Sequence, residues 1–409
     1  MTVSRRNALV AATGLLSTVV AGSAKAQPQG KPVKIGVLND MSGPYADITG
    51  QSSLLAVQMA VEDFGGIVLG RKIEVVSADH QNKPDLGSAI ARRWYDQDGV
   101  GVIIGVGSSA VALAMRSFTR DNGKLDIYTT TGTSTLTGSA CSPTGFHWMH
   151  DTYALAKVVA NAVVRNGGDT WYLVVVDYAF GHDLERDVTR FVKEAGGHVL
   201  GSALHPINST DFSSYLLQAQ SSGAKIIGLA NAGSDLINTV KTAREFGVGG
   251  TGSKQSFAGF LVMVTDVHAI GLDLAQGMLL TEAFYWDLTD DSRAWSKRFF
   301  ERRKLMPNQM NAGDYSSALH YLKSVQAAGT DEPVAVAAAM RTLPINDPTI
   351  KNGKIRSDGR VERDMYLFRV KTPSQSESEW DIYDLVSTVP FKDAFRPLSE
   401  GGCVMPGGK

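Results

Sequence analysis

The chain has 409 residues, of which 43% are hydrophobic and 20% are charged, and its formal net charge is −1. This composition is typical of a globular protein and argues against a disordered chain. The near-neutral charge excludes the strongly basic surface that binding to nucleic acid or to anionic lipid requires. The length exceeds that of a usual single core and predicts two lobes.

The first 26 residues have the pattern of an export signal. Arg5-Arg6 precede an apolar run from Ala8 to Val20, and Ala24-Lys25-Ala26 form an A-x-A end, which predicts cleavage after Ala26. The arginine pair resembles a twin-arginine signal, but general secretion and an uncleaved anchor stay as alternatives. Removing this segment leaves 37 basic and 41 acidic residues, a net charge of −4. We expect an exported protein with no membrane insertion of its own.

Strands and helices alternate from residue 33 to residue 128. The hydrophobic pattern predicts strands over 33–38, 72–79, 100–106 and 125–128, with helices over 54–64, 84–98 and from residue 110 onwards. Strands that alternate with helices predict an open parallel sheet, in which ligands lie beyond the carboxyl ends of the strands. Tyr45 lies in the loop after the first strand, where core packing does not explain an aromatic side chain.

Two neighbouring polar turns follow the third and fourth of these strands. Ser108 and Ser109 come directly before the third helix, and Thr131 and Thr133 follow the fourth strand. A helix N-terminus offers free N–H groups and the positive end of its dipole to an anion, and the hydroxyls add donors. These turns predict a site for a small anion, most simply a carboxylate. Helix capping without any ligand is the alternative for each hydroxyl.

Other chemistries have weaker support in the sequence. Gly105-x-Gly107-x-x-Ala110 with Asp126 is close to a dinucleotide fingerprint, so an exported cofactor-dependent oxidoreductase is a rival hypothesis from another class. His147 and His150 lack a third metal ligand at a known spacing. No catalytic motif can be assigned, and we expect no enzymatic activity, no cofactor and no metal.

The alternation resumes after a linker at 138–151 and completes a second lobe. Strands are predicted over 171–176, 199–204, 225–229, 257–262 and 278–284, mostly helix over 289–341, and two late strands over 365–370 and 381–385. The expected fold is α/β, with two doubly wound parallel-sheet lobes joined by a hinge that the chain crosses more than once. Lobe one should comprise 30–150 with 285–355, lobe two 151–284 with 356–390, and a C-terminal tail 391–409.

Cys141 and Cys403 are the two cysteines of the chain. In an oxidising compartment a pair is more often bridged than free. A disulfide would fasten the C-terminal tail to the loop that follows the threonine-rich turn. Two independent buried thiols are the alternative.

Several segments together resemble the periplasmic leucine/isoleucine/valine-binding proteins, which are type I substrate-binding proteins of ABC importers. They are Met41-Ser42-Gly43-Pro44, Ala60-Val61-Glu62-Asp63 and the two polar turns, in the order and spacing of that family. The resemblance implies a two-lobed clamp that delivers its ligand to a membrane permease. It also implies that Ser109, Thr131 and Thr133 hold the ligand carboxylate and that Phe180 contacts the ligand body.

The chain departs from the amino-acid binders where they hold the ligand ammonium. Ala232 stands near their tyrosine and Leu261 near their glutamate, while Asp151 or Trp148 occupies the position of a second acid. An ammonium group buried without a partner is costly. We therefore expect a carboxylate ligand without an α-amino group.

The implied ligand is an aromatic acid. The segments 146–156 and 282–287 resemble family members associated with aromatic-acid uptake, and Tyr45 and Phe180 would enclose the ring. A branched-chain or other amino acid held by Asp151 is the alternative ligand. The protein is expected to be a monomer, and ligand sensing stays as an alternative to transport.

Overall fold

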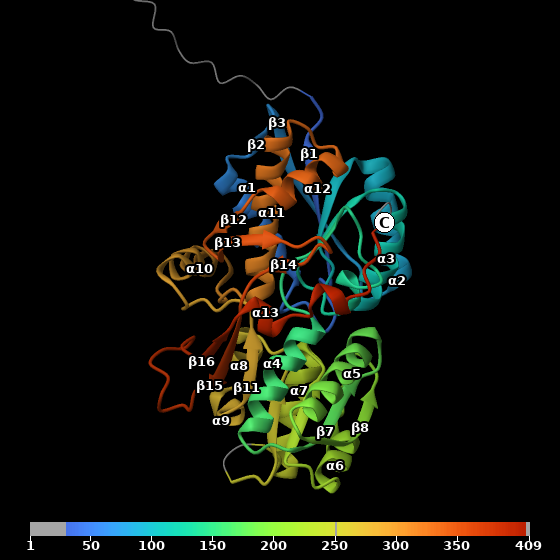
Figure 1. Ribbon diagram of the computed structural model, residues 1–409. Helices are drawn as coiled ribbons and strands as arrows, with labels where there is room; N and C mark the ends of the chain where they lie inside the picture. The colour runs from blue at the N-terminus through green and yellow to red at the C-terminus, as the bar shows by residue number, and fades with distance from the viewer. Residues whose placement is uncertain (1–29, 250–251, 406–409) are drawn as a thin grey trace, which may run out of the picture.

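Two lobes stacked one above the other make up the molecule (Figure 1). The computed structural model describes residues 30–249 and 252–405. The predicted signal segment and residues 406–409 of the predicted tail lie outside these residues. Within the described residues, no helix is long and apolar enough to span a membrane.

Lobe one is built on a six-stranded sheet with the order β2-β3-β1-β4-β5-β6. Its strands are β1 (Val33–Asn39), β2 (Ile67–Val68), β3 (Arg71–Asp79), β4 (Val100–Gly105), β5 (Leu125–Tyr128) and β6 (Gly145–His147). All neighbours pair in parallel except β2, which is antiparallel to β3. The carboxyl ends of β1, β4 and β5 therefore meet at one edge of the sheet, where their exit loops face lobe two.

Among the described residues, six helices belong to lobe one. They are α1 (Gly50–Phe64), α2 (Pro84–Arg93), α3 (Ser109–Asp121), α10 (Asp290–Arg303), α11 (Gln309–Ala328) and α12 (Pro333–Thr342). Helix α1 stops at Gly65, whose left-handed backbone (φ 104°) suits glycine. Short helical turns cover 94–98 and 134–137, and a small sheet consists of β12 (Ile345–Asp347), β13 (Ile350–Ile355) and β14 (Val361–Glu362).

Lobe two has a seven-stranded sheet with the order β16-β15-β11-β10-β9-β7-β8. Its strands are β7 (Thr170–Val176), β8 (His198–His205), β9 (Ile226–Ala230), β10 (Ser256–Gly259), β11 (Leu279–Glu282), β15 (Met365–Val370) and β16 (Tyr383–Val389). Its helices are α4 (Thr152–Arg165), α5 (Ala179–Glu194), α6 (Ser213–Ser221), α7 (Gly233–Ala243), α8 (Val264–Ile270) and α9 (Leu272–Ala275), with a helical turn at 244–246.

The two-lobed α/β fold is confirmed, although each sheet is mixed and not purely parallel. Strands β15 and β16 return antiparallel beside β11. The sequence also read 138–151 as linker and predicted no strand between 289 and 364, whereas β6, β12, β13 and β14 lie there. Strands β6, β12 and β14 have two or three residues, too few to show a hydrophobic period, and the six residues of β13 are mostly polar.

In the described part of the chain, the backbone passes between the lobes at 148–151, at 283–289 and at 363–364. The sequence assigned residues 356–362 to lobe two, but the structure keeps them with lobe one. Strand β14 pairs with β13, and the carbonyl oxygen of Gly359 accepts a hydrogen bond from the His147 N–H at 2.9 Å. The third crossing therefore starts after Glu362.

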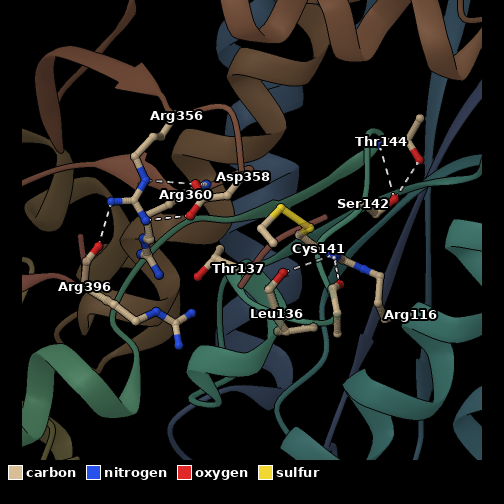
Figure 2. Close-up of a disulfide and its surroundings, with 12 residues drawn as sticks. Arg116, Leu136, Thr137, Cys141, Ser142, Thr144, Arg356, Asp358, Arg360 and Arg396 are labelled. Atoms are coloured by element: carbon tan, nitrogen blue, oxygen red, sulfur yellow. Dashed lines mark hydrogen bonds and ion pairs between the residues drawn. A yellow bond between two sulfur atoms is a disulfide. The ribbon is translucent and has the colours of Figure 1, made fainter. Parts of the chain in front are cut away.

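The C-terminal tail connects the lobes once more. After β16 it forms α13 (Phe391–Ala394), which packs on α4, and a helical turn at 398–400. Arg396 then donates from Nη2 to the carbonyl oxygen of Ser134 at 2.8 Å, and a disulfide joins Cys403 to Cys141 in lobe one (Figure 2). Arg356 anchors the middle of the tail by donating to the Arg396 carbonyl oxygen at 2.8 Å.

Asn308 holds helix α11 against the loop before α1. Its Oδ1 accepts the N–H groups of Met310 and Asn311 at 2.9 and 3.2 Å, and its Nδ2 donates to the Ile48 carbonyl oxygen at 2.9 Å. Replacing it with alanine should lower the free energy of unfolding by about 2 kcal/mol, because a cap and a buried hydrogen bond are lost together. Urea denaturation measures this loss. The exposed cap variant Thr289→Ala, the control, should lose about 1 kcal/mol or less, and an equal loss in both would contradict the assignment.

Candidate ligand-binding cleft

A small cavity lies between the two lobes. It is lined by loops at the carboxyl ends of β1, β4 and β5 from one side and by the starts of α5 and α7 from the other. The lining residues are Tyr45, Ile48, Thr49, Gly107, Ser109, Thr130, Gly132, Tyr178, Phe180, Ala232, Leu261 and Met310. None of these described residues has a charged side chain. Hydroxyl, aromatic and aliphatic groups therefore determine what the cavity accepts.

Ser109 opens helix α3 at one wall of the cavity. Its side-chain oxygen accepts the N–H of Thr133 at 3.2 Å, so its own hydroxyl proton remains available to donate elsewhere. The first N–H groups of a helix have no partner within that helix, and the helix dipole adds partial positive charge there. This wall is suited to an anionic group.

The other three predicted hydroxyls are placed differently. The Ser108 hydroxyl is buried, does not line the cavity and has no hydrogen-bond partner among the described residues. Thr131 donates to the carbonyl oxygen of Val106, and Thr133 donates to Asp183 of lobe two. The hydroxyl proton of Thr131 is therefore used within the turn, and that of Thr133 is used in a contact between the lobes.

Aromatic rings line the cavity from both lobes. Phe180 is 2% exposed and faces Gly132, where a Cβ atom would lie 2.7 Å from the ring. The hydroxyl oxygens of Tyr45 and Tyr178 lie 2.8 Å apart in a hydrogen bond between the lobes. Burial raises the pKa of both phenols well above the ordinary value. Both hydroxyls therefore stay neutral in the physiological range and keep their protons.

Neither Trp148 nor Asp151 reaches this cavity. Trp148 is fully buried in the core and donates from Nε1 to the Ser316 hydroxyl at 3.0 Å. Asp151 caps α4 by accepting the N–H of Ala154 at 2.9 Å, and its other oxygen lies 3.4 Å from Nη1 of buried Arg360. The structure thus gives Asp151 two structural partners, which corrects its expected position beside a ligand ammonium.

Ala232 and Leu261 do line the cavity, together with several residues that the sequence analysis did not select. Ile48, Thr49 and Met310 come from the loop before α1 and from α11, and the sequence carried no signal for them. Thr130 and Gly132 belong to the threonine-rich turn that was recognised. Which residues of that turn face inward could not be read from composition.

The dinucleotide hypothesis loses its acidic residue in the structure. Asp126 is fully buried, and its Oδ1 lies 2.9 Å from Nη2 of Arg116, which is 1% exposed. This carboxylate is held in a buried ion pair and is not free to hold a ribose.

The two histidines of the predicted linker are buried as well. His147 Nε2 lies 2.8 Å from the Thr131 carbonyl oxygen, and burial lowers the pKa of His150 to about 3. Across residues 30–249 and 252–405, no group of three or more His, Cys, Asp or Glu side chains is arranged to hold a metal ion.

Comparison with known proteins identifies the family. The family model described as "Periplasmic binding protein" matches residues 32–377. The chain belongs to this family. A "Leu/Ile/Val-binding protein homolog 4" of Brucella abortus (strain 2308) is 30% identical over 279 residues, which span 65% of this chain and 64% of that relative. The family expected from the sequence is confirmed.

Solved structures in this family agree with the fold. A periplasmic binding protein from Burkholderia mallei is 47% identical, with a TM-score of 0.88 over 91% of this chain and 98% of that chain. A branched-chain amino acid ABC transporter periplasmic ligand-binding protein from Burkholderia xenovorans LB400 is 41% identical, with a TM-score of 0.80 over 91% and 99%. A solute-binding protein from R. palustris in complex with benzoate, 20% identical with a TM-score of 0.80 over 91% and 99%, shares the fold.

Proposed function

We propose that this periplasmic binding protein serves a branched-chain-amino-acid-type ABC importer and captures a small carboxylate between its lobes. It would act by binding and delivery to a membrane permease, without catalysis, in the periplasm. The proposed ligand is an aromatic acid that lacks an α-amino group. Ser109 and the start of α3 would hold the carboxylate, and Phe180 and Tyr45 would enclose the ring.

The uncharged lining of the cavity is the observation that carries this proposal. An anion can be held by a hydroxyl and a helix N-terminus alone. A ligand ammonium would need a carboxylate, because a buried charge without a partner costs several kcal/mol. Leu261 and Ala232 offer apolar contact where the resemblance places the ammonium site of amino-acid binders.

An amino acid is the second candidate ligand, and the names of two relatives favour it. They are the Leu/Ile/Val-binding protein homologue and the branched-chain amino acid ligand-binding protein. The protein with bound benzoate favours the aromatic acid. The two candidates differ in one testable group, the ligand ammonium.

A thermal-shift screen of the protein from Gln27 onward tests the proposal. A ligand that binds only the folded state at a hundredfold excess over Kd stabilises it by about 2.7 kcal/mol. Benzoate-type or cinnamate-type acids should raise the melting temperature, while leucine and phenylalanine should not. A shift with amino acids alone would contradict the aromatic-acid assignment.

The hydrogen bond between Tyr45 and Tyr178 joins the lobes across the cavity, so it should contribute to ligand affinity. If the lobes close on the ligand, this bond forms only in the closed state. Tyr178→Phe should raise the Kd of the bound acid about fivefold, the equivalent of about 1 kcal/mol. Fluorescence or calorimetric titration measures the change.

The matched control is Tyr172→Phe. The Tyr172 hydroxyl lies 3.5 Å from Oε1 of Gln218 within lobe two, so its loss should leave the Kd unchanged. Equal affinities of wild type and Tyr178→Phe would show that the tyrosine pair takes no part in closure.

A further inference from the structure

Asn39 links the two turns that line the carboxylate end of the cavity. It is the last residue of β1 and is fully buried. Its Oδ1 accepts two hydrogen bonds, from the N–H of Gly107 at 2.9 Å and from the hydroxyl of Thr130 at 3.0 Å. Gly107 belongs to the turn after β4 and Thr130 to the turn after β5, and both line the cavity. One side-chain oxygen therefore fixes the spacing of the two turns.

The chemistry of the donors determines the orientation of the Asn39 amide. The Gly107 N–H can only donate and therefore requires an oxygen acceptor, so Oδ1 faces the turns and the Thr130 hydroxyl donates to the same oxygen. Nδ2 faces away from them and has no hydrogen-bond partner among the described residues. The side chain also fits closely, since a Cβ atom on Gly105 would lie 2.7 Å from Nδ2.

The turn that Asn39 contacts has an unfavourable backbone conformation. Val106 has φ of 65°, in the left-handed region that β-branched residues rarely adopt. Such a conformation persists only where surrounding contacts hold it in place. The Val106 N–H donates to the Leu38 carbonyl oxygen at 2.8 Å, and the Thr131 hydroxyl donates to the Val106 carbonyl oxygen. The Asn39 bond to Gly107 completes this restraint on the cavity side.

We propose that Asn39 is a positioning residue for ligand binding, one that holds the strained turn at Val106 and sets Ser109 and the start of α3 in place for the carboxylate. The inference rests on the proposed carboxylate function. It does not depend on whether the rest of the ligand is an aromatic ring or an amino acid, because both candidate ligands carry a carboxylate.

Asn39→Leu tests this role, because leucine has a similar size and accepts no hydrogen bond. The Kd for benzoate should rise at least tenfold at a temperature where the variant is fully folded by circular dichroism. Adding Val106→Gly should recover part of the affinity, because glycine adopts a positive φ without strain. Gln255→Leu is the control. Its buried amide donates to two carbonyl oxygens in lobe two, at 2.8 and 3.0 Å, so this variant should lose stability and keep its Kd.

Hydrogen exchange at Gly107 gives a readout that needs no ligand. Exchange of its amide should accelerate at least tenfold in Asn39→Leu and stay slow in Asn39→Asp, whose carboxylate can accept the same two bonds. If wild type binds leucine and not benzoate, the titrations use leucine, and the aromatic-acid proposal fails while this one is still tested. Unchanged exchange at Gly107, or an unchanged Kd in Asn39→Leu, would overturn the role of Asn39.

Discussion

Replacing Asp126 with alanine should lower the free energy of unfolding by about 3–5 kcal/mol. The carboxylate is fully buried and pairs with Arg116 at 2.9 and 3.3 Å. It also accepts hydrogen bonds from the hydroxyls of Thr119 and Tyr128. Removing one partner of a buried ion pair leaves the other charge without compensation, and this is the origin of so large a loss. Urea denaturation followed by circular dichroism measures the change through the transition midpoint and slope.

Two further variants separate the buried charge from other effects. Arg116→Leu together with Asp126→Ala should be less destabilising than Asp126→Ala alone, because no unpaired charge remains. Asp98→Ala breaks an exposed Arg–Asp pair, with Arg93 at 3.0 Å and side chains 68% and 37% exposed, and should cost at most about 1 kcal/mol. A loss in Asp126→Ala no larger than that in Asp98→Ala would contradict the structural role given to this pair.

Ser109→Ala should weaken binding of the ligand carboxylate by about 10–100-fold. A hydrogen bond to a charged group contributes about 1.5–3 kcal/mol, and the Ser109 hydroxyl proton is the donor that the cavity wall offers. The variant should fold normally, because it removes only one hydrogen bond, the one from the N–H of Thr133 at 3.2 Å. The helix keeps its other contacts. Calorimetric titration of benzoate into wild type and variant measures the ratio of the two Kd values.

Ser108→Ala is the control for this experiment. The two serines are neighbours at the start of the same helix, but the Ser108 hydroxyl lies outside the lining of the cavity. Its loss should change the Kd less than twofold. Equal losses in the two variants would mean that the start of α3 matters as a whole, and that Ser109 makes no contact of its own with the ligand.

The lobes themselves could be predicted because each βα unit carries a strong local signal. The apolar run 100–106 predicts β4, and the spacing of apolar residues up to Phe64, followed by Gly65-Gly66, predicts α1 and its end. The antiparallel return of β15 and β16 could not be predicted, since pairing with β11 joins residues 84 to 90 positions apart in the chain. The short strands β12 to β14 likewise form by pairing with one another and not from a local hydrophobic pattern.

Cleft residues could be predicted only where an aromatic or hydroxyl side chain stands in the segment that follows a strand of a βα unit. Tyr45, Ser109 and Phe180 each follow a strand directly, and all three line the cavity. Asp151 follows β6 in a similar way, but its carboxylate accepts a hydrogen bond from Arg360, which is 209 residues away in the chain. Met310 likewise enters from a helix that the chain reaches only after its second crossing. Contacts of this kind depend on tertiary structure and leave no local pattern.

The most direct test of the central claim compares benzoate with benzamide, which lacks the carboxylate, and with phenylalanine, which carries an ammonium group beside its carboxylate. Benzoate, benzamide and phenylalanine are titrated calorimetrically into the protein from Gln27 onward, under identical conditions. A site that holds a carboxylate and offers nothing to an ammonium should bind benzoate and should bind neither of the other two measurably. Binding of phenylalanine or leucine without benzoate would show that the cleft accommodates an ammonium group after all, and would contradict the proposed ligand class.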